Sequence, residues 1–189
     1  MNKKRAVKKD ALDMIVSGRG GQGVLTAGKI ISAVFVKMGY DVKMSVDRGI
    51  AQRGGLITCH IRAGKKIFSP LISKGKADIL MLMDSRGVNG FSGYLKDQGL
   101  IILLGQRAAD SGYKNLLKIS YDKVVGDLGG VMTVNIFMLG VLSNYSGCKN
   151  EYWLDSIREA GFLSGMTDLN LAAFKLGRGK PDIYGKLNT

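Results

Sequence analysis

The residue types best suited to hold a ligand lie in a glycine-rich run near the amino terminus, Gly-Arg-Gly-Gly-Gln-Gly. Gly18, Gly20 and Gly23 match the spacing G-x-G-x-x-G, in which glycines allow a tight turn and a close backbone approach to a ligand. Gly21 and Gln22 complete the candidate turn. If a helix follows, its unpaired N–H groups and positive dipole end favour phosphate or carboxylate at this place. The alternative is a turn that needs glycines for packing alone.

A dinucleotide site of this kind also requires an acidic residue about 20 residues further on, which binds the ribose hydroxyls. Asp47 is the nearest candidate, but the positive charge of Arg48, the next residue, weakens its selectivity for a ribose hydroxyl. A stand-alone NAD(P)- or nucleotide-binding oxidoreductase, or a nucleotide-binding regulator, is therefore the alternative function rather than the first hypothesis.

The second candidate site is a basic, glycine-bearing loop that follows a predicted strand. It contains Arg48, Gln52, Arg53, Gly54 and Gly55. The planar fork of an arginine suits phosphate or carboxylate. Parallel α/β folds bind ligands at the carboxyl ends of their strands. We expect this loop to face an anionic cofactor or a partner subunit there; the alternative is a surface loop whose charges are solvated.

The chain offers little for catalysis of its own. His60 is the single histidine, and it lacks the further ligands that a metal site needs, so we expect a packed or hydrogen-bonded residue. Cys59 and Cys148 fall short of the roughly four thiolates of an iron–sulfur cluster, and they form no C-x-x-C pair. We expect both to be buried apolar residues in a reducing cytoplasm. The sequence predicts no catalytic residue and no metal ligand in this chain.

Alternating strand and helix patterns must position these residues. Apolar runs and period-two alternation predict strands at residues 12–17, 41–47, 56–62, 77–84, 99–105 and 116–119, with a short returning strand at 67–68 that forms a hairpin with 56–62. Helical spacing predicts helices at residues 24–38, 86–96, 129–142, 151–160 and 167–176. This order is typical of a single doubly wound α/β domain with a mostly parallel sheet, a β-hairpin insertion and C-terminal helices.

Composition agrees with one folded domain that has a basic surface. Of 189 residues, 46% are hydrophobic and 23% charged, with a net charge of +13. We expect residues 1–10 to form a basic disordered tail, 11–180 the α/β domain and 181–189 a C-terminal tail. No apolar run approaches the roughly 18 residues of a membrane span, and no apolar segment follows the basic start, so we expect a cytoplasmic protein. The basic residues are scattered without interleaved aromatics, which favours an acidic cofactor or partner protein over nucleic acid.

Ordered motifs across most of the chain resemble one known family. They are the segments at residues 18–24, 49–55 (Gly-Ile-Ala-Gln-Arg-Gly-Gly), 60–62, 68–72 (Phe-Ser-Pro-Leu-Ile), 77–80, 135–140 and 170–174. Between Asp13 and Gly177 the chain resembles the gamma-type subunit or domain of the 2-oxoacid:ferredoxin oxidoreductases, the pyruvate/ketoisovalerate oxidoreductase gamma type. Within that family it is most similar to the beta subunit of indolepyruvate oxidoreductase. Arg19 and Arg48 depart from the usual residues of the family.

The resemblance implies a subunit of a larger enzyme rather than an enzyme by itself. Such complexes decarboxylate a 2-oxoacid, here indolepyruvate or a related aryl or branched 2-oxoacid, on thiamine diphosphate. They pass electrons through [4Fe–4S] clusters to ferredoxin and release an acyl-CoA. A partner subunit would carry the thiamine and the clusters, and this chain would help to shape the CoA and substrate region. We expect the isolated chain to be inactive and able to self-associate as a homodimer, with neither nucleic acid nor membrane as a partner.

Overall fold

The computed structural model describes residues 11–48, 55–105, 113–163, 165–179 and 187–188. The strands are β1 (Ala11–Arg19), β2 (Asp41–Arg48), β3 (Leu56–Gly64), β4 (Ala77–Leu82), β5 (Leu95–Leu104), β6 (Leu116–Ile119) and β7 (Leu187–Asn188). The helices are α1 (Val24–Lys37), α2 (Arg86–Phe91), α3 (Tyr121–Leu128), α4 (Val134–Ser143), α5 (Asn150–Arg158) and α6 (Met166–Gly179), with a 3₁₀ turn at Ser92–Tyr94.

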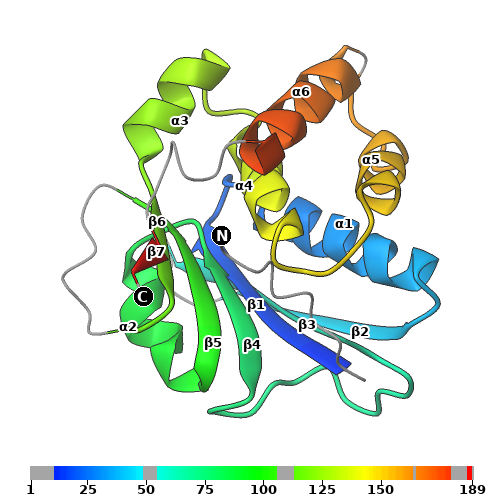
Figure 1. Cartoon of the computed structure of the whole chain (residues 1–189), viewed down its shortest axis with the longest axis vertical. Coiled ribbons are helices and arrows are strands. Elements are labelled where there is room, and N and C mark those ends of the chain that lie inside the picture. The colour runs from blue at the N-terminus through cyan, green and yellow to red at the C-terminus, as the bar shows by residue number, and fades with distance from the viewer. Residues whose placement is uncertain (1–10, 49–54, 106–112, 164, 180–186, 189) are drawn as a thin grey trace.

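The strands form one sheet in the order β2-β3-β1-β4-β5-β6-β7 (Figure 1). Strands β1, β4, β5 and β6 run parallel at its centre. At the edges, β3 pairs antiparallel with both β1 and β2, and β7 pairs antiparallel with β6. Every residue of β4 is buried, as expected for a central parallel strand that is covered on both faces. The predicted single, mostly parallel α/β sheet is therefore confirmed, whereas β3 forms its hairpin with β2 instead of with residues 67–68.

Helices cover the two faces unequally. Helices α1, α4, α5 and α6 lie together on one face, where they enclose the larger hydrophobic core (Figure 1). Helix α2 and the 3₁₀ turn cover part of the other face over a smaller core around Leu80 and Ile101. Over β1 and β3 that second face carries polar residues instead, among them Asp13, Ser17 and His60. The face of the sheet under α1, α4, α5 and α6 is thus apolar, whereas the opposite face is partly polar.

Helix α4 is buried along its whole length, and it contacts α6 backbone to backbone. A Cβ atom at Gly140 would meet the carbonyl oxygen of Phe174, and one at Gly177 would meet that of Phe137. Trp153 on α5 stacks on Phe174 with 5.9 Å between ring centroids. These glycines let two helices approach closely, and the aromatic pair fills the space beside them.

Some predicted elements were wrong in detail. Residues 67–68 form no strand; instead the Ile67 N–H donates to the carboxylate of Asp41, so a side chain anchors this segment and β3 pairs with its neighbours β1 and β2. The predicted helix at 86–96 ends at Phe91, and β5 begins earlier than predicted. Helix α3 was not predicted, although its apolar residues Tyr121, Val124, Val125 and Leu128 recur at helical spacing and pack against the larger core.

The ends of the chain were assigned to tails. Residues 1–10 lie outside the described part of the chain, whereas residues 187–188 form β7 against β6. No helix in the part of the chain that the structure describes is long and apolar enough to cross a membrane.

Candidate functional site

The glycine turn lies where the sequence predicts it, between the end of β1 and the start of α1. Gly21 (φ 86°) and Gly23 (φ 72°) adopt the left-handed conformation that side chains disfavour. A Cβ atom at Gly20 or Gly21 would meet no atom of the described residues within 4 Å, so that part of the structure leaves this side of the turn open. The backbone at Gly20 and Gly21 is therefore accessible to an incoming group.

The other residues of the turn are committed to packing. A Cβ atom at Gly18 would crowd Gln22, and one at Gly23 would meet Asn135 of α4. The Gln22 side-chain oxygen accepts a hydrogen bond from the Arg19 N–H (2.6 Å), and its NH₂ group donates to the Met83 carbonyl (3.1 Å). Both ends of the Gln22 amide are thus used to hold the turn against the end of β4. The sequence left open whether the glycines of the turn serve packing or ligand binding. Gly18 and Gly23 serve packing, whereas Gly20 and Gly21 leave space for a ligand.

A cluster of charges borders the turn. The Asp84 carboxylate, with 9% of its side chain exposed, lies 2.8 Å from the Arg19 guanidinium and 2.9 Å from that of Arg86. Burial by itself would raise the pKa of Asp84, but hydrogen bonds from the side chain and backbone of Arg86, and the charges of Arg86 and Arg19, hold it below its usual value. One ionised carboxylate thus faces two arginines, each more than half exposed, and the net local charge is positive.

Sequence reasoning did not select Asp84 and Arg86 as site residues. Their signal was their place directly after a buried parallel strand, since the carboxyl ends of neighbouring parallel strands meet at one edge of the sheet. Arg19, noted as a departure from the family, is the residue that joins them to the turn.

The described ends of the second predicted motif lie at the same end of the sheet as the glycine turn. Most of this motif lies outside the described residues, namely Gln52, Arg53, Gly54 and the side chain of Arg48. The backbone register shows that Arg48 and Gly18 both pair with Ile57 of β3, from opposite sides. Two strand spacings, about 10 Å, therefore separate them. The strand register places the glycine turn and the backbone of Arg48 at the carboxyl ends of the parallel strands β1 and β2, and the contacts of the loop stay a prediction.

The same register weakens the dinucleotide alternative. In the sequence pattern of a dinucleotide site, the acidic residue follows the second strand of a βαβ unit, next to the glycine turn. Here β3 lies between β1 and β2, so Asp47 is two strands away from the turn. Asp47 is poorly placed to bind a ribose held at Gly20 and Gly21.

The histidine and the cysteines have structural surroundings. His60 is buried in the sheet; its Nδ1 accepts the Ile72 N–H (3.2 Å), its ring contacts Tyr94 edge to face, and burial lowers its pKa. Cys59 and Cys148 are free and buried, and burial raises the pKa of Cys59 to about 11. Among the residues described, no group of His, Cys, Asp and Glu side chains could hold a metal ion.

The fold and the site define a doubly wound α/β domain with an open, positively charged βα turn. The chain belongs to the pyruvate ferredoxin/flavodoxin oxidoreductase family, whose sequence profile matches residues 13–179.

Known relatives support this membership and confirm the predicted resemblance. The indolepyruvate oxidoreductase subunit IorB of Archaeoglobus fulgidus is 29% identical over 194 residues, which cover 88% of this chain and 93% of that protein. The gamma subunit of keto/oxoacid ferredoxin oxidoreductase from Geobacter sulfurreducens has a similar fold (TM-score 0.77, 20% identity), covering 94% of this chain and 100% of that one. The same fold occurs in 2-oxoglutarate:ferredoxin oxidoreductase from Magnetococcus marinus (TM-score 0.77, 18% identity), solved with 2-oxoglutarate, coenzyme A and succinyl-CoA bound. There the match covers 93% of this chain but only 32% of the other.

Proposed function

We propose that this chain is the gamma-type subunit of a 2-oxoacid:ferredoxin oxidoreductase that acts on indolepyruvate or a related aryl or branched 2-oxoacid. The observation that carries this proposal is the match to an indolepyruvate oxidoreductase subunit over nearly the full length of both proteins. In the reaction, the 2-oxoacid loses CO₂, its acyl group forms a thioester with the sulfur of CoA, the thiol proton is released, and two electrons pass to ferredoxin. Thiamine diphosphate and [4Fe–4S] clusters in the complex would supply the carbanion and electron-transfer chemistry.

The described part of this chain suits a binding role in that reaction. Its two buried cysteines and single histidine, without acidic neighbours that complete a metal site, do not fit a cluster. We therefore assign the clusters and the thiamine to a partner subunit, through which ferredoxin would be reduced. The free, buried cysteines agree with a reducing, cytoplasmic location, which stays a prediction.

The glycine turn suits a polyanion such as CoA. Gly20 and Gly21 leave room for a phosphate to approach the backbone, and Arg19 and Arg86 supply exposed guanidinium groups beside it. Asp84 pairs with both arginines, neutralises one of their charges and leaves one positive charge in excess. We propose that this turn, together with the basic loop after β2, contacts CoA or the partner subunit next to it. The side chains of this chain would bind and orient CoA, and would transfer no proton.

The test is to purify the tagged chain from its native cells and identify what accompanies it. We expect a larger subunit with bound thiamine diphosphate and iron–sulfur clusters. The reconstituted pair should reduce a dye with indolepyruvate and CoA, whereas the chain alone should be colourless and inactive. Activity of the isolated chain, or binding of NAD(H) with no partner recovered, would contradict the proposal.

A further inference from the structure

The segment that joins β3 to β4, residues 65–76, lies at the end of the sheet opposite the glycine turn. It precedes the amino end of β4, whereas the turn follows the carboxyl end of the parallel strand β1. The sequence motif Phe-Ser-Pro-Leu-Ile at residues 68–72 falls within it and has no place in the site described above. We name residues 65–76 the β3–β4 loop.

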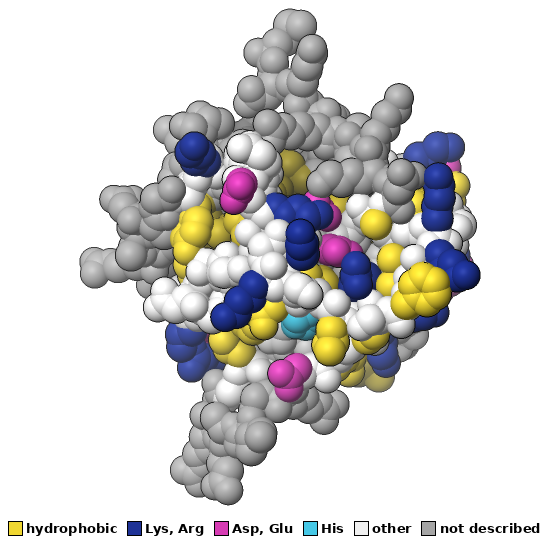
Figure 2. Space-filling model, turned by 90° about the horizontal axis from the view of Figure 1, so that it is seen from below, with side chains coloured by type: hydrophobic (Ala, Val, Ile, Leu, Met, Phe, Trp, Pro, Cys, Tyr) yellow, Lys and Arg dark blue, Asp and Glu magenta, His cyan; other side chains and the backbone are white. Residues whose placement is uncertain are grey.

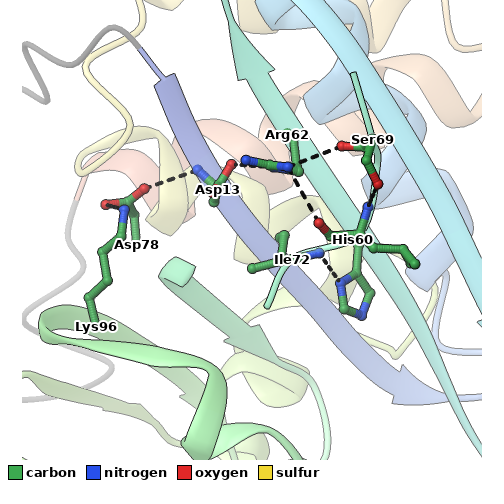
Figure 3. A network of polar contacts seen from close by, with 8 residues as sticks. Asp13, His60, Arg62, Ser69, Ile72, Asp78 and Lys96 are labelled. Atoms are coloured by element: carbon green, nitrogen blue, oxygen red, sulfur yellow. Dashed lines mark hydrogen bonds and ion pairs between the residues drawn. The ribbon is translucent and has the colours of Figure 1, made fainter. Parts of the chain in front are cut away.

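Side chains of β2 and β3 hold the backbone of this loop, and Figure 3 shows those of β3. The Arg62 guanidinium donates to the carbonyl oxygens of Ser69 (3.2 Å) and Leu71 (3.4 Å), and it pairs with the Asp13 carboxylate (2.9 Å). His60 Nδ1 accepts the Ile72 N–H. At the start of the loop, the Ile67 N–H donates to the Asp41 carboxylate (2.8 Å).

A second ion pair steadies these anchors. The Asp13 N–H donates to the Asp78 carboxylate (3.0 Å), which also lies 2.8 Å from the Lys96 ammonium group (Figure 3). The network thereby joins β1, β3, β4 and β5 beneath the loop. A loop fixed at this many points loses little conformational entropy when a partner binds it.

Four apolar residues of the loop alternate in burial: the first and last are buried, and the two between them are exposed. Ile67 and Ile72 are buried, whereas Phe68 is 85% exposed and Leu71 63% exposed. Large apolar side chains that a rigid backbone holds in water are typical of residues that insert into a pocket of a partner. Phe68 and Leu71 therefore have the exposure and the rigid support of anchor residues.

The charge of the loop specifies what kind of surface it would meet. Lys65, Lys66, Lys74 and Lys76 are exposed, and residues 65–76 contain no Asp or Glu. The Lys66 ammonium group lies 5.1 Å from the centre of the Phe68 ring. Seen from below, this end of the molecule shows Lys and Arg side chains spread among exposed hydrophobic ones (Figure 2). A partner surface must therefore be apolar at its centre and acidic at its rim.

We infer that the β3–β4 loop docks into an acidic-rimmed apolar pocket on the larger subunit of the oxidoreductase, with Phe68 and Leu71 inserted. The inference rests on the proposed function, which supplies the larger subunit. A second copy of this chain is disfavoured, because the net charge is +13 and the same basic loop would face itself. A lipid surface accepts apolar side chains in any arrangement, whereas this loop is held in one conformation, which favours a matched protein pocket.

The experiment measures binding of the purified larger subunit to the wild-type chain and to variants by biolayer interferometry. We expect Phe68→Ala with Leu71→Ala to weaken Kd at least tenfold, because truncated anchor residues dominate binding energy. Lys74→Glu with Lys76→Glu should weaken binding most at low salt. Val36→Ala, an exposed apolar residue on α1, is the matched control and should leave Kd within twofold. Thermal melting should show that all variants are folded, since the changed side chains are exposed.

Four results would overturn the inference. If the wild-type chain binds but the Phe68/Leu71 variant binds equally well, the loop is not the docking element, although the proposed function stands. If that variant binds normally but loses binding to phosphatidylserine vesicles, the loop serves a membrane; if it loses only self-association, the loop serves a homodimer. If the wild-type chain fails to bind the larger subunit, the proposed function fails as well, and the two failures are thereby distinguished.

Discussion

Substitutions in the glycine turn separate its folding role from its binding role. Gly21 has φ 86° and Gly20 lies outside the left-handed region, yet both face open space. Gly21→Val should therefore cost roughly 1–2 kcal/mol in backbone strain without a steric clash. For a domain of this size, about 2–4 °C in Tm corresponds to 1 kcal/mol, so we expect a fall of about 2–8 °C. Gly20→Val should change the free energy of unfolding by at most about 0.5 kcal/mol.

The same two variants should behave alike in CoA binding. Either valine would stand where a phosphate approaches the backbone, and one charge-assisted hydrogen bond is worth roughly 1.5–3 kcal/mol. We expect CoA affinity of the assembled complex to fall about tenfold or more in both, measured by isothermal titration calorimetry beside thermal melts. Gly20→Val is decisive, because it should be stable and yet defective. Normal CoA binding by this variant would refute a CoA site at the turn, and a Tm loss equal to that of Gly21→Val would refute the geometry.

Further predictions concern stability and charge. Gly177→Ala should lower the free energy of unfolding, measured by chemical denaturation, by about 1–3 kcal/mol, because its Cβ would press on the Phe137 carbonyl. Gly126→Ala on α3, whose Cβ would meet no atom of the described residues, should raise it by about 0.5–1 kcal/mol. Equal effects of the two variants would contradict the α4–α6 packing. Burial lowers the pKa of His60 in the folded chain, although the charge of Asp47 acts in the opposite direction. As the pH falls, the unfolded chain therefore binds a proton at this histidine before the folded chain does. This contribution to stability should be complete above about pH 6.5 and fall as the pH drops toward the folded pKa, and a pH titration of His60→Gln should lack that step. Asp84→Asn should remove the charge that neutralises one of the two arginines. The affinity of the complex for CoA should therefore rise at low salt and depend more steeply on the salt concentration. A weaker affinity at every salt concentration would contradict this and show that the carboxylate mainly orients the arginines.

Local sequence patterns determined much of this protein. The strand–glycine–helix unit at β1 and α1, the buried strand β4 and the C-terminal helices follow from hydrophobic periodicity and glycine placement, which act over a few residues. The ordered motifs likewise identify the family, because they depend on the sequence and not on contacts between distant residues. Helix α3 also has apolar residues at helical spacing, at 121, 124, 125 and 128, but its eight residues are too few for periodicity alone to identify a helix.

Only the tertiary structure decided which of these elements are neighbours. The place of β3 between β1 and β2, which removes Asp47 from the turn, depends on pairing between strands distant in the sequence. The Asp84 cluster and the anchoring of the β3–β4 loop by Arg62 join residues on different strands and loops. The open space at Gly20, in contrast to the crowding at Gly18, depends on what packs above each residue. The physical reason is that local propensity fixes the period of an element, whereas register, burial and charge pairing depend on the surfaces that meet when the elements pack.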